Sequence, residues 1–144
     1  MSNFSVEINN VIVHNGDHLP LNKVQTKPKI NYKKQQGDNY TIIMVDPDAP
    51  AKNNPIYKYW LHLLITNNDQ TIVPFEPPTP PINSGEHRYI IYLLKQKTII
   101  NKSEIKVSND KNGNIKRNNF NLAEFIHDHK LEIVDSVYFI TENK

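Results

Sequence analysis

The sequence predicts a mainly β fold in which antiparallel strands pack as a sandwich. Three near-continuous apolar runs, at residues 40–46, 58–67 and 87–96, have the composition expected of strands that are buried on both faces. Turn sequences and proline-rich loops separate these runs, and only one later segment has a helical pattern. An α+β domain is the alternative that this pattern leaves open.

Shorter elements flank these three strands. Residues 4–13 alternate loosely and are rich in β-formers, and residues 28–33 resemble a short strand. Residues 136–143 are expected to form the final strand. Turns or loops are predicted at residues 14–20, 35–39, 47–55, 67–70 and 109–114.

The only convincing helix is predicted at residues 121–130. Asn119 or Asn121 is the candidate N-cap, because an asparagine side chain can accept a hydrogen bond from the first helical turn. Its apolar face consists of Leu122, Phe125 and Ile126.

Residues 71–86 contain five prolines, which exclude a helix interior or a central strand. We therefore expect this segment to have no regular structure and to form a rigid rim. The alternative is a polyproline stretch that binds an aromatic-lined domain.

Composition narrows the class of protein. A chain of 144 residues suits a single domain covering residues 1–144, and the absence of cysteine excludes a disulfide framework. The net charge of +2 and the scattered lysines argue against nucleic-acid binding. We see no signal peptide and no apolar run of the ~20 residues that a membrane span needs. The sequence therefore predicts a soluble, cytoplasmic protein.

Charged, aromatic and imidazole side chains occur where the three core strands meet the proline-rich loops. These residues are Asp46, Asp48, Tyr57, Trp60, His62, His87, Arg88 and Tyr89. If the strands are neighbours, the side chains converge at one end of the sheet and form a concave site.

The residues alone leave three chemistries open for this site. A metal site would use Asp46 or Asp48 with His62 and His87, although no H-x-x-x-H spacing is present. A hydrolase would need a nucleophile, but there is no cysteine and Ser84 is not in a G-x-S-x-G context. The pattern favours an anion site, in which a histidine and backbone N–H groups donate hydrogen bonds and an aspartate orients the histidine.

Three motifs carry a family resemblance: "DPDAP", "YKYWLHLLITN" and "PPINSGEHRYIIYLLKQ". In this order and spacing they resemble the phosphatidylethanolamine-binding protein family, which includes Raf kinase inhibitor proteins and plant flowering regulators. The resemblance covers roughly residues 10 to 140 and implies a central antiparallel β-sheet packed on a smaller β-sheet, with one or two peripheral helices.

The resemblance also implies a site. Its lining would be Asp46, Tyr57, Trp60, His62, Pro81, Gly85, His87 and Tyr89. Asp48 and Arg88 would form a supporting ion pair beneath the pocket, and Pro50 would help to fix the loop. We expect Asp46 to accept a hydrogen bond from a pocket histidine.

The function implied is non-enzymatic binding of a phosphate-like anion or a phospholipid head group, with no cofactor, no metal and no catalytic residue. Family analogy adds regulation of a partner such as a protein kinase or a protease. The alternatives are a metal- or histidine-dependent phosphoester hydrolase that uses Asp46, His62 and His87, and a scaffold with a vestigial pocket.

The sequence departs from the family pattern at its C-terminal side. Mammalian members continue into a helix that covers the pocket mouth, whereas this chain stops at "VYFITENK". We therefore expect a short family member without that helix and with a more open pocket. Strand alternation from His87 predicts that Glu86 faces solvent.

Overall fold

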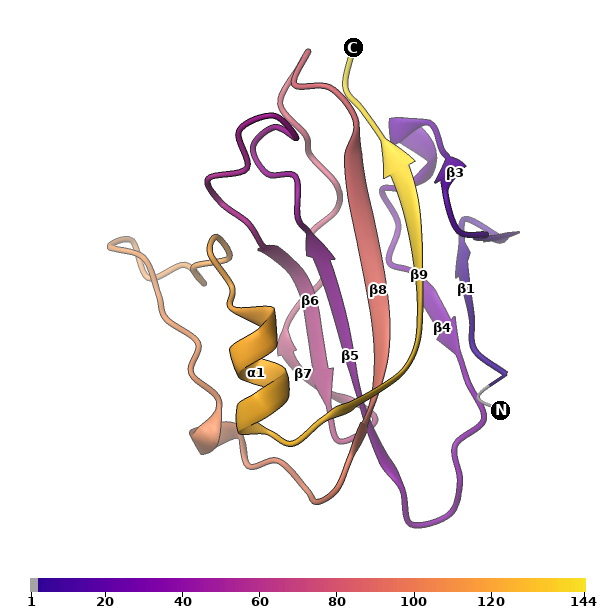
Figure 1. Ribbon diagram of the computed structural model, residues 1–144, viewed down its shortest axis with the longest axis vertical. Helices are drawn as coiled ribbons and strands as arrows, with labels where there is room; N and C mark the ends of the chain where they lie inside the picture. Colours follow the sequence, from indigo (N-terminus) through magenta and orange to yellow (C-terminus); the bar gives the residue numbers. More distant parts are fainter. Residues whose placement is uncertain (1–2) are drawn as a thin grey trace.

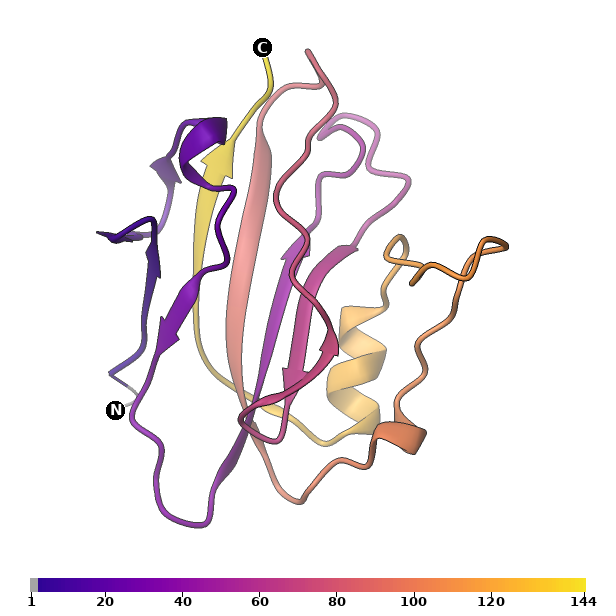
Figure 2. The same ribbon diagram turned by 180° about the vertical axis from the view of Figure 1, so that it is seen from behind.

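The computed structural model describes residues 3–144, and their strands form two sheets (Figures 1 and 2). The three-stranded sheet has the order β2-β1-β4 and the six-stranded sheet the order β3-β9-β8-β5-β6-β7. The strands are β1 (Ser5–Ile8), β2 (Val11–Ile12), β3 (Asp17–His18), β4 (Lys29–Asn31), β5 (Asn39–Asp46), β6 (Trp60–Thr66), β7 (Gln70–Val73), β8 (His87–Gln96) and β9 (Glu132–Thr141). The helical elements are η1 (Leu21–Lys23), η2 (Lys102–Glu104) and α1 (Leu122–Asp128).

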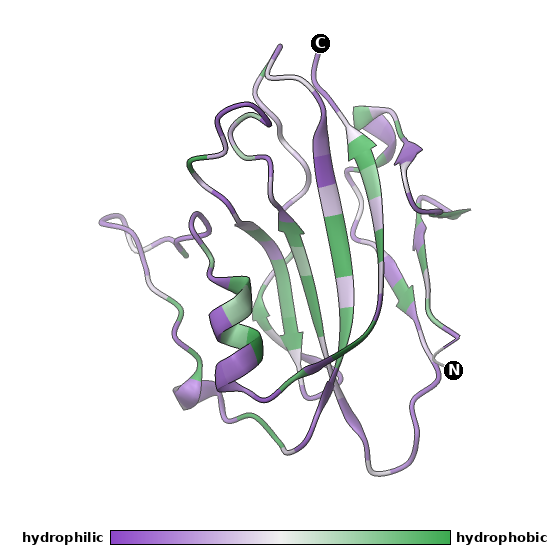
Figure 3. Cartoon of the chain, viewed as in Figure 1, coloured by the Kyte–Doolittle hydropathy of each residue, from purple (hydrophilic) through white to green (hydrophobic). Residues whose placement is uncertain are grey.

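The apolar runs of β5, β6 and β8 are explained by burial on both faces of the large sheet. One face packs against the small sheet, with Met44, Leu63 and Tyr89 in the shared core. The opposite face packs against α1, and Leu122 and Phe125 of the helix are buried there. Figure 3 shows the resulting hydrophobic colouring along the central strands. The predicted mainly β fold with two sheets and little helix is confirmed.

Two predicted boundaries differ at the N-terminal side. The expected strand at 4–13 is a hairpin of β1 and β2, because Asn9 and Asn10 adopt φ angles of 53° and 65° and turn the chain. The turn expected at 14–20 contains β3, which pairs in parallel with β9. Asparagine tolerates the left-handed region, so an apparently continuous strand pattern concealed a reversal.

The proline-rich segment was predicted to lack regular structure throughout, and this is wrong for its first residues. β7 pairs antiparallel with β6 at the edge of the large sheet. It ends at Val73, directly before the first proline, and residues 74–86 have no helix or strand. An edge strand needs partners on one side only, which lets irregular chain follow it directly.

The C-terminal elements have different ends from those expected. Asn121 is the N-cap of α1, and its side chain accepts a hydrogen bond of 3.0 Å from the backbone N–H of Glu124. The helix ends at Asp128, and β9 begins at Glu132 rather than at residue 136. No helix within residues 3–144 is long and apolar enough to cross a bilayer.

Candidate functional site

A cavity of about 230 Å³ opens at the end of the large sheet where β5 ends and β8 begins. Its lining residues are Asp46, Ala49, Pro50, Tyr57, Trp60, His62, Glu76, Thr79, Pro80, Pro81, His87 and Tyr89. The structure thus brings together all the predicted lining residues except Gly85, which lies in the loop before β8 with a φ of 87°. Pro50, predicted as a supporting residue, lines the cavity itself.

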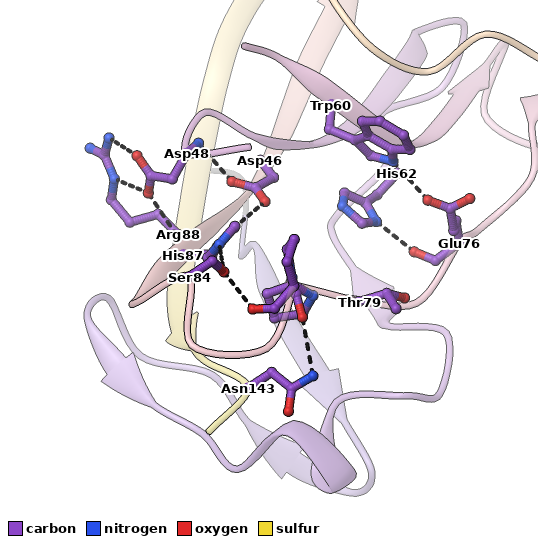
Figure 4. Close-up of polar contacts among 12 residues, drawn as sticks. Asp46, Asp48, Trp60, His62, Glu76, Thr79, Ser84, His87, Arg88 and Asn143 are labelled. Carbon is purple, nitrogen blue, oxygen red and sulfur yellow. Dashed lines mark hydrogen bonds and ion pairs between the residues drawn. The ribbon is translucent and has the colours of Figure 1, made fainter. Parts of the chain in front are cut away.

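His87 lies at the centre of the polar groups in this cavity (Figure 4). Its Nδ1 is 2.8 Å from Oδ2 of Asp46, and its Nε2 is 2.9 Å from Oγ of Ser84. The Ser84 hydroxyl donates its own proton to the carbonyl oxygen of Pro81, at 2.6 Å. The Asp46 carboxylate therefore accepts from Nδ1–H of His87, and Nε2 faces a hydroxyl group that can both accept and donate.

Asp46, His87 and Ser84 are hydrogen-bonded in the order of a serine-hydrolase triad, but the Ser84 hydroxyl directs its proton at a carbonyl oxygen and not at His87. A nucleophilic serine must give its proton to the histidine, whereas Ser84 gives it to a carbonyl oxygen. With its proton directed at Pro81, the Ser84 oxygen can accept a hydrogen bond from Nε2 of His87. This arrangement suits the binding of an acceptor atom better than the removal of a proton.

His62 has different hydrogen-bond partners from His87. Its Nδ1 donates a hydrogen bond of 2.6 Å to the carbonyl oxygen of Glu76, which leaves Nε2 with a lone pair. Burial lowers the pKa of His62, because the charged ring would lose its hydration. The ring of Tyr89 packs edge-on against His62, with centroids 5.2 Å apart. The cavity thus contains a histidine that burial favours in its neutral form, His62, and one that is fixed by a carboxylate, His87.

The two aspartates of "DPDAP" have separate roles. Asp46 faces His87, whereas Asp48 accepts two hydrogen bonds from the Arg88 side chain, at 2.8 and 2.9 Å, and a third from the Arg88 backbone N–H. Burial opposes ionisation of Asp48, but the Arg88 hydrogen bonds outweigh it and lower the pKa of this carboxyl group. The backbone N–H of Asp48 also donates to Oδ1 of Asp46 at 2.7 Å. The Arg88–Asp48 pair therefore supports the residue that holds His87.

Glu76 forms part of the wall and was not predicted. Its Oε1 accepts a hydrogen bond of 2.7 Å from the Trp60 indole, and its Oε2 is 3.4 Å from Nε of Arg117. Ala49, Thr79 and Pro80 were also missed. One signal was available, because Glu76 is the only acid among the five prolines.

Each acid of the lining has a basic side chain within ion-pair distance. Asp46 pairs with His87, and Glu76 pairs with Arg117. Burial and the Asp46 carboxylate raise the pKa of Tyr89, so its hydroxyl keeps its proton. Among residues 3–144, no cluster of three or more His, Asp or Glu side chains has the geometry to hold a metal ion.

The sequence matches a known family over most of its length. A family model described as phosphatidylethanolamine-binding protein matches residues 9–139. A phosphatidylethanolamine-binding protein homolog of Acanthamoeba polyphaga mimivirus is 49% identical over 143 residues, which cover 99% of each chain. The chain belongs to the phosphatidylethanolamine-binding protein family.

Other proteins that the chain resembles are less similar in sequence. FLOWERING LOCUS T of Arabidopsis thaliana is 37% identical over 93 residues, which cover 58% of this chain and 52% of that protein. A crystal structure of carboxypeptidase Y inhibitor complexed with its cognate proteinase superposes with a TM-score of 0.80 at 25% identity, over 98% of this chain and 83% of that one. The family member from Plasmodium vivax has a TM-score of 0.78 at 17% identity, over 100% of this chain and 86% of that one, which is a likeness of fold alone.

The lowered pKa of His62 predicts that the free energy of unfolding depends on pH. Its pKa in the folded protein lies below the ordinary 6.5, so the unfolded chain takes up a proton there that the folded chain does not. Stability should therefore fall as the pH drops below about 6.5, and the loss should be smaller in His62→Gln. Urea unfolding at pH 7.5 and at pH 5.5 measures the change in unfolding free energy for the wild type and for His62→Gln. The exposed His127→Gln is the matched control, and a wild-type slope in His62→Gln would contradict the prediction.

Proposed function

We propose that the protein is a non-enzymatic binding module that holds a phosphate-type anion or a phospholipid head group in this cavity. One observation carries the proposal, namely that the buried His87 lines the cavity with its Nδ1 fixed by the Asp46 carboxylate and its Nε2 2.9 Å from the Ser84 hydroxyl. An anionic oxygen can replace the Ser84 hydroxyl as the acceptor for the Nε2–H of His87. Charge-assisted hydrogen bonds of this kind are about twice as strong as neutral ones.

The two carboxylates of the lining narrow the class of ligand. A group that carries only negative charge would meet the carboxylates of Asp46 and Glu76 in the same cavity. A zwitterionic head group can place its anionic oxygen near His87 and its ammonium near Glu76 or the lone pair of His62. We therefore expect phosphoethanolamine to bind more tightly than inorganic phosphate.

A regulatory role is the second part of the proposal. A structural relative is a carboxypeptidase Y inhibitor in complex with its proteinase, and it shares 25% identity with this chain. We propose that this protein likewise acts by direct contact with a partner enzyme, a protease or a protein kinase. A common fold does not determine which partner is bound.

The ligand proposal predicts a change in thermal stability. A ligand that binds only the folded state, at ~100 times its dissociation constant, adds about 2.7 kcal/mol to the free energy of unfolding. Phosphoethanolamine should therefore raise the melting temperature of the wild type and leave that of His87→Ala unchanged. The exposed His127→Ala should behave as the wild type. Because His87→Ala leaves Asp46 buried without its partner, the double variant Asp46→Ala/His87→Ala is measured in parallel.

Other outcomes would favour the alternatives. Stabilisation by divalent metals alone, together with turnover of a phosphoester that His87→Ala abolishes, would assign a hydrolase. If no ligand shifts any of the proteins, the pocket is vestigial and the protein acts through its surface as a scaffold.

A further inference from the structure

Residues 19–37 form a strongly basic segment that includes β4. The segment contains five lysines and no acid, although acids and bases are almost equal in number over the whole chain. Within residues 3–144, no carboxylate lies within ion-pair distance of any of these lysines. Their charge is therefore available to a partner. The five exposed side chains are Lys23, Lys27, Lys29, Lys33 and Lys34.

The extended chain around β4 directs three of these lysines to one face. Ile30 and Tyr32 pack against the core that the two sheets share, so the residues between and beside them face solvent. The side chain of Asn31 fits this direction, because it donates to Oε2 of Glu7 at 2.9 Å, and Glu7 lies between two buried residues of β1. Positions two apart on this face are separated by roughly 7 Å. The lysines on it are Lys27, Lys29 and Lys33.

β4 is also an open edge of the small sheet. β1 pairs with it on one side, and β4 is the last strand in the order β2-β1-β4. Apart from the pairing with β1, no hydrogen bond reaches the backbone of residues 26–34 from any described residue. Figure 2 shows β4 in front of the large sheet, with α1 behind it. An edge of this kind can take a further strand through main-chain hydrogen bonds.

The lysines determine which strand can pair at this edge. Two β4 strands from two copies of the chain would place lysine beside lysine, which is unfavourable. Edge lysines can serve this protective purpose alone. A strand with acids at alternate positions has the opposite effect, because its carboxylates recur at the same spacing of roughly 7 Å and meet the lysines on one face. Its other side chains lie on the side of Ile30 and Tyr32.

We infer that β4 is a docking edge for an extended acidic segment of a protein partner, in which acidic and apolar residues alternate. Lys27, Lys29 and Lys33 pair with the acids of that segment, and the backbone of β4 pairs with its backbone. No residue of β4 lines the cavity, so this inference does not rest on the proposed ligand.

Fluorescence anisotropy with labelled synthetic peptides tests the docking edge. The probe is a short peptide that strictly alternates glutamate and valine, and the reference peptide has the same composition with all its glutamates in one block. The wild type should bind the alternating peptide at least about tenfold more tightly than the reference. An alternating peptide with methylated backbone nitrogens should not bind, because its main-chain donors are lost.

Two triple variants of equal charge locate the binding surface. Lys27→Gln/Lys29→Gln/Lys33→Gln should bind the alternating peptide about tenfold more weakly than the wild type, because three cross-strand charge pairs are lost. The control Lys102→Gln/Lys106→Gln/Lys111→Gln changes exposed positions outside the small sheet and should bind as the wild type does. Both variants should keep the stabilisation by phosphoethanolamine, because none of the six lysines lines the cavity.

The outcomes decide the inference without reference to the cavity. Equal affinity of the wild type for the alternating and block peptides would overturn it, because simple charge attraction does not depend on residue order. Equal losses in the two triple variants would do the same. A wild type that binds neither peptide would also overturn it, and the lysines of β4 would then only protect the edge. Loss of peptide binding in the β4 variant alone upholds the docking edge, whether or not phosphoethanolamine binds.

Discussion

Replacing Arg88 by alanine is expected to lower the free energy of unfolding by about 3 kcal/mol, because it leaves a buried carboxylate without its partner. Asp48 is 2% exposed, and its side chain would keep only the backbone N–H of residue 88 as a donor. We place the value at the lower end of the range for broken buried pairs, since the Arg88 side chain itself is 43% exposed. Urea unfolding of both proteins at pH 7 measures the difference.

Two further measurements distinguish the Arg88 fork from simple positive charge. Arg88→Lys keeps the charge but cannot donate two parallel hydrogen bonds, so it should recover only part of the loss. The pKa of Asp48 in the folded protein is below its ordinary 3.8, so this contribution is present above that pH and is lost as the pH falls through the folded value. Lys97→Ala, at an exposed position, is the control. Equal stability of Arg88→Ala and Lys97→Ala would reject a structural role for Arg88.

The parts of the fold that the sequence predicted correctly have the longest and most uniform patterns. β5 and β6 are buried at all but their first positions and β8 has a central run of six apolar residues, so the run itself marks each strand. β3 has two residues, and its pairing with β9 joins segments more than 120 residues apart. No local pattern encodes such a contact, because it depends on the tertiary packing.

In the candidate site as well, the residues on long strands were predicted, whereas Glu76 in an irregular segment was not. Asp46, His62 and His87 lie on or beside the long strands, and the strand positions bring them together. Glu76 lies in a segment without regular structure, where sequence gives no direction to a side chain. Ser84 was considered and set aside for lack of a nucleophile motif. Its hydrogen bond to His87 depends on the loop conformation at residues 81–84.

Arg117 shows most clearly what sequence reasoning missed. It is one of only two arginines in the sequence and lies in a region with no predicted element. In the structure it donates to the carbonyl oxygens of Leu61, His62 and Pro74, at 3.0, 3.3 and 2.9 Å, and pairs with Glu76. A planar fork with five N–H donors can connect four acceptors on two segments, which lysine cannot do. Arg117 therefore connects β6 to the wall that follows β7.

Replacing Arg117 by alanine is expected to cost about 3 kcal/mol of stability, because several partly buried carbonyl oxygens lose a donor. It should also raise the pKa of His62. Burial is the main cause of the low pKa of that ring, and the positive charge of Arg117 adds to it. Without Arg117 the charge is gone and the wall at Glu76 loosens toward water. Urea unfolding and an NMR titration of the His62 ring measure the two effects.

The variant Arg117→Lys separates these two effects. It keeps the positive charge but loses the fork, so stability should fall while the pKa of His62 changes less than in Arg117→Ala. The connection also predicts weaker ligand binding in both variants, since Trp60 and His62 are held through Glu76. If Arg117→Ala loses stability but keeps the wild-type pKa of His62 and wild-type ligand affinity, Arg117 stabilises the fold alone. The cavity wall would then be held without it.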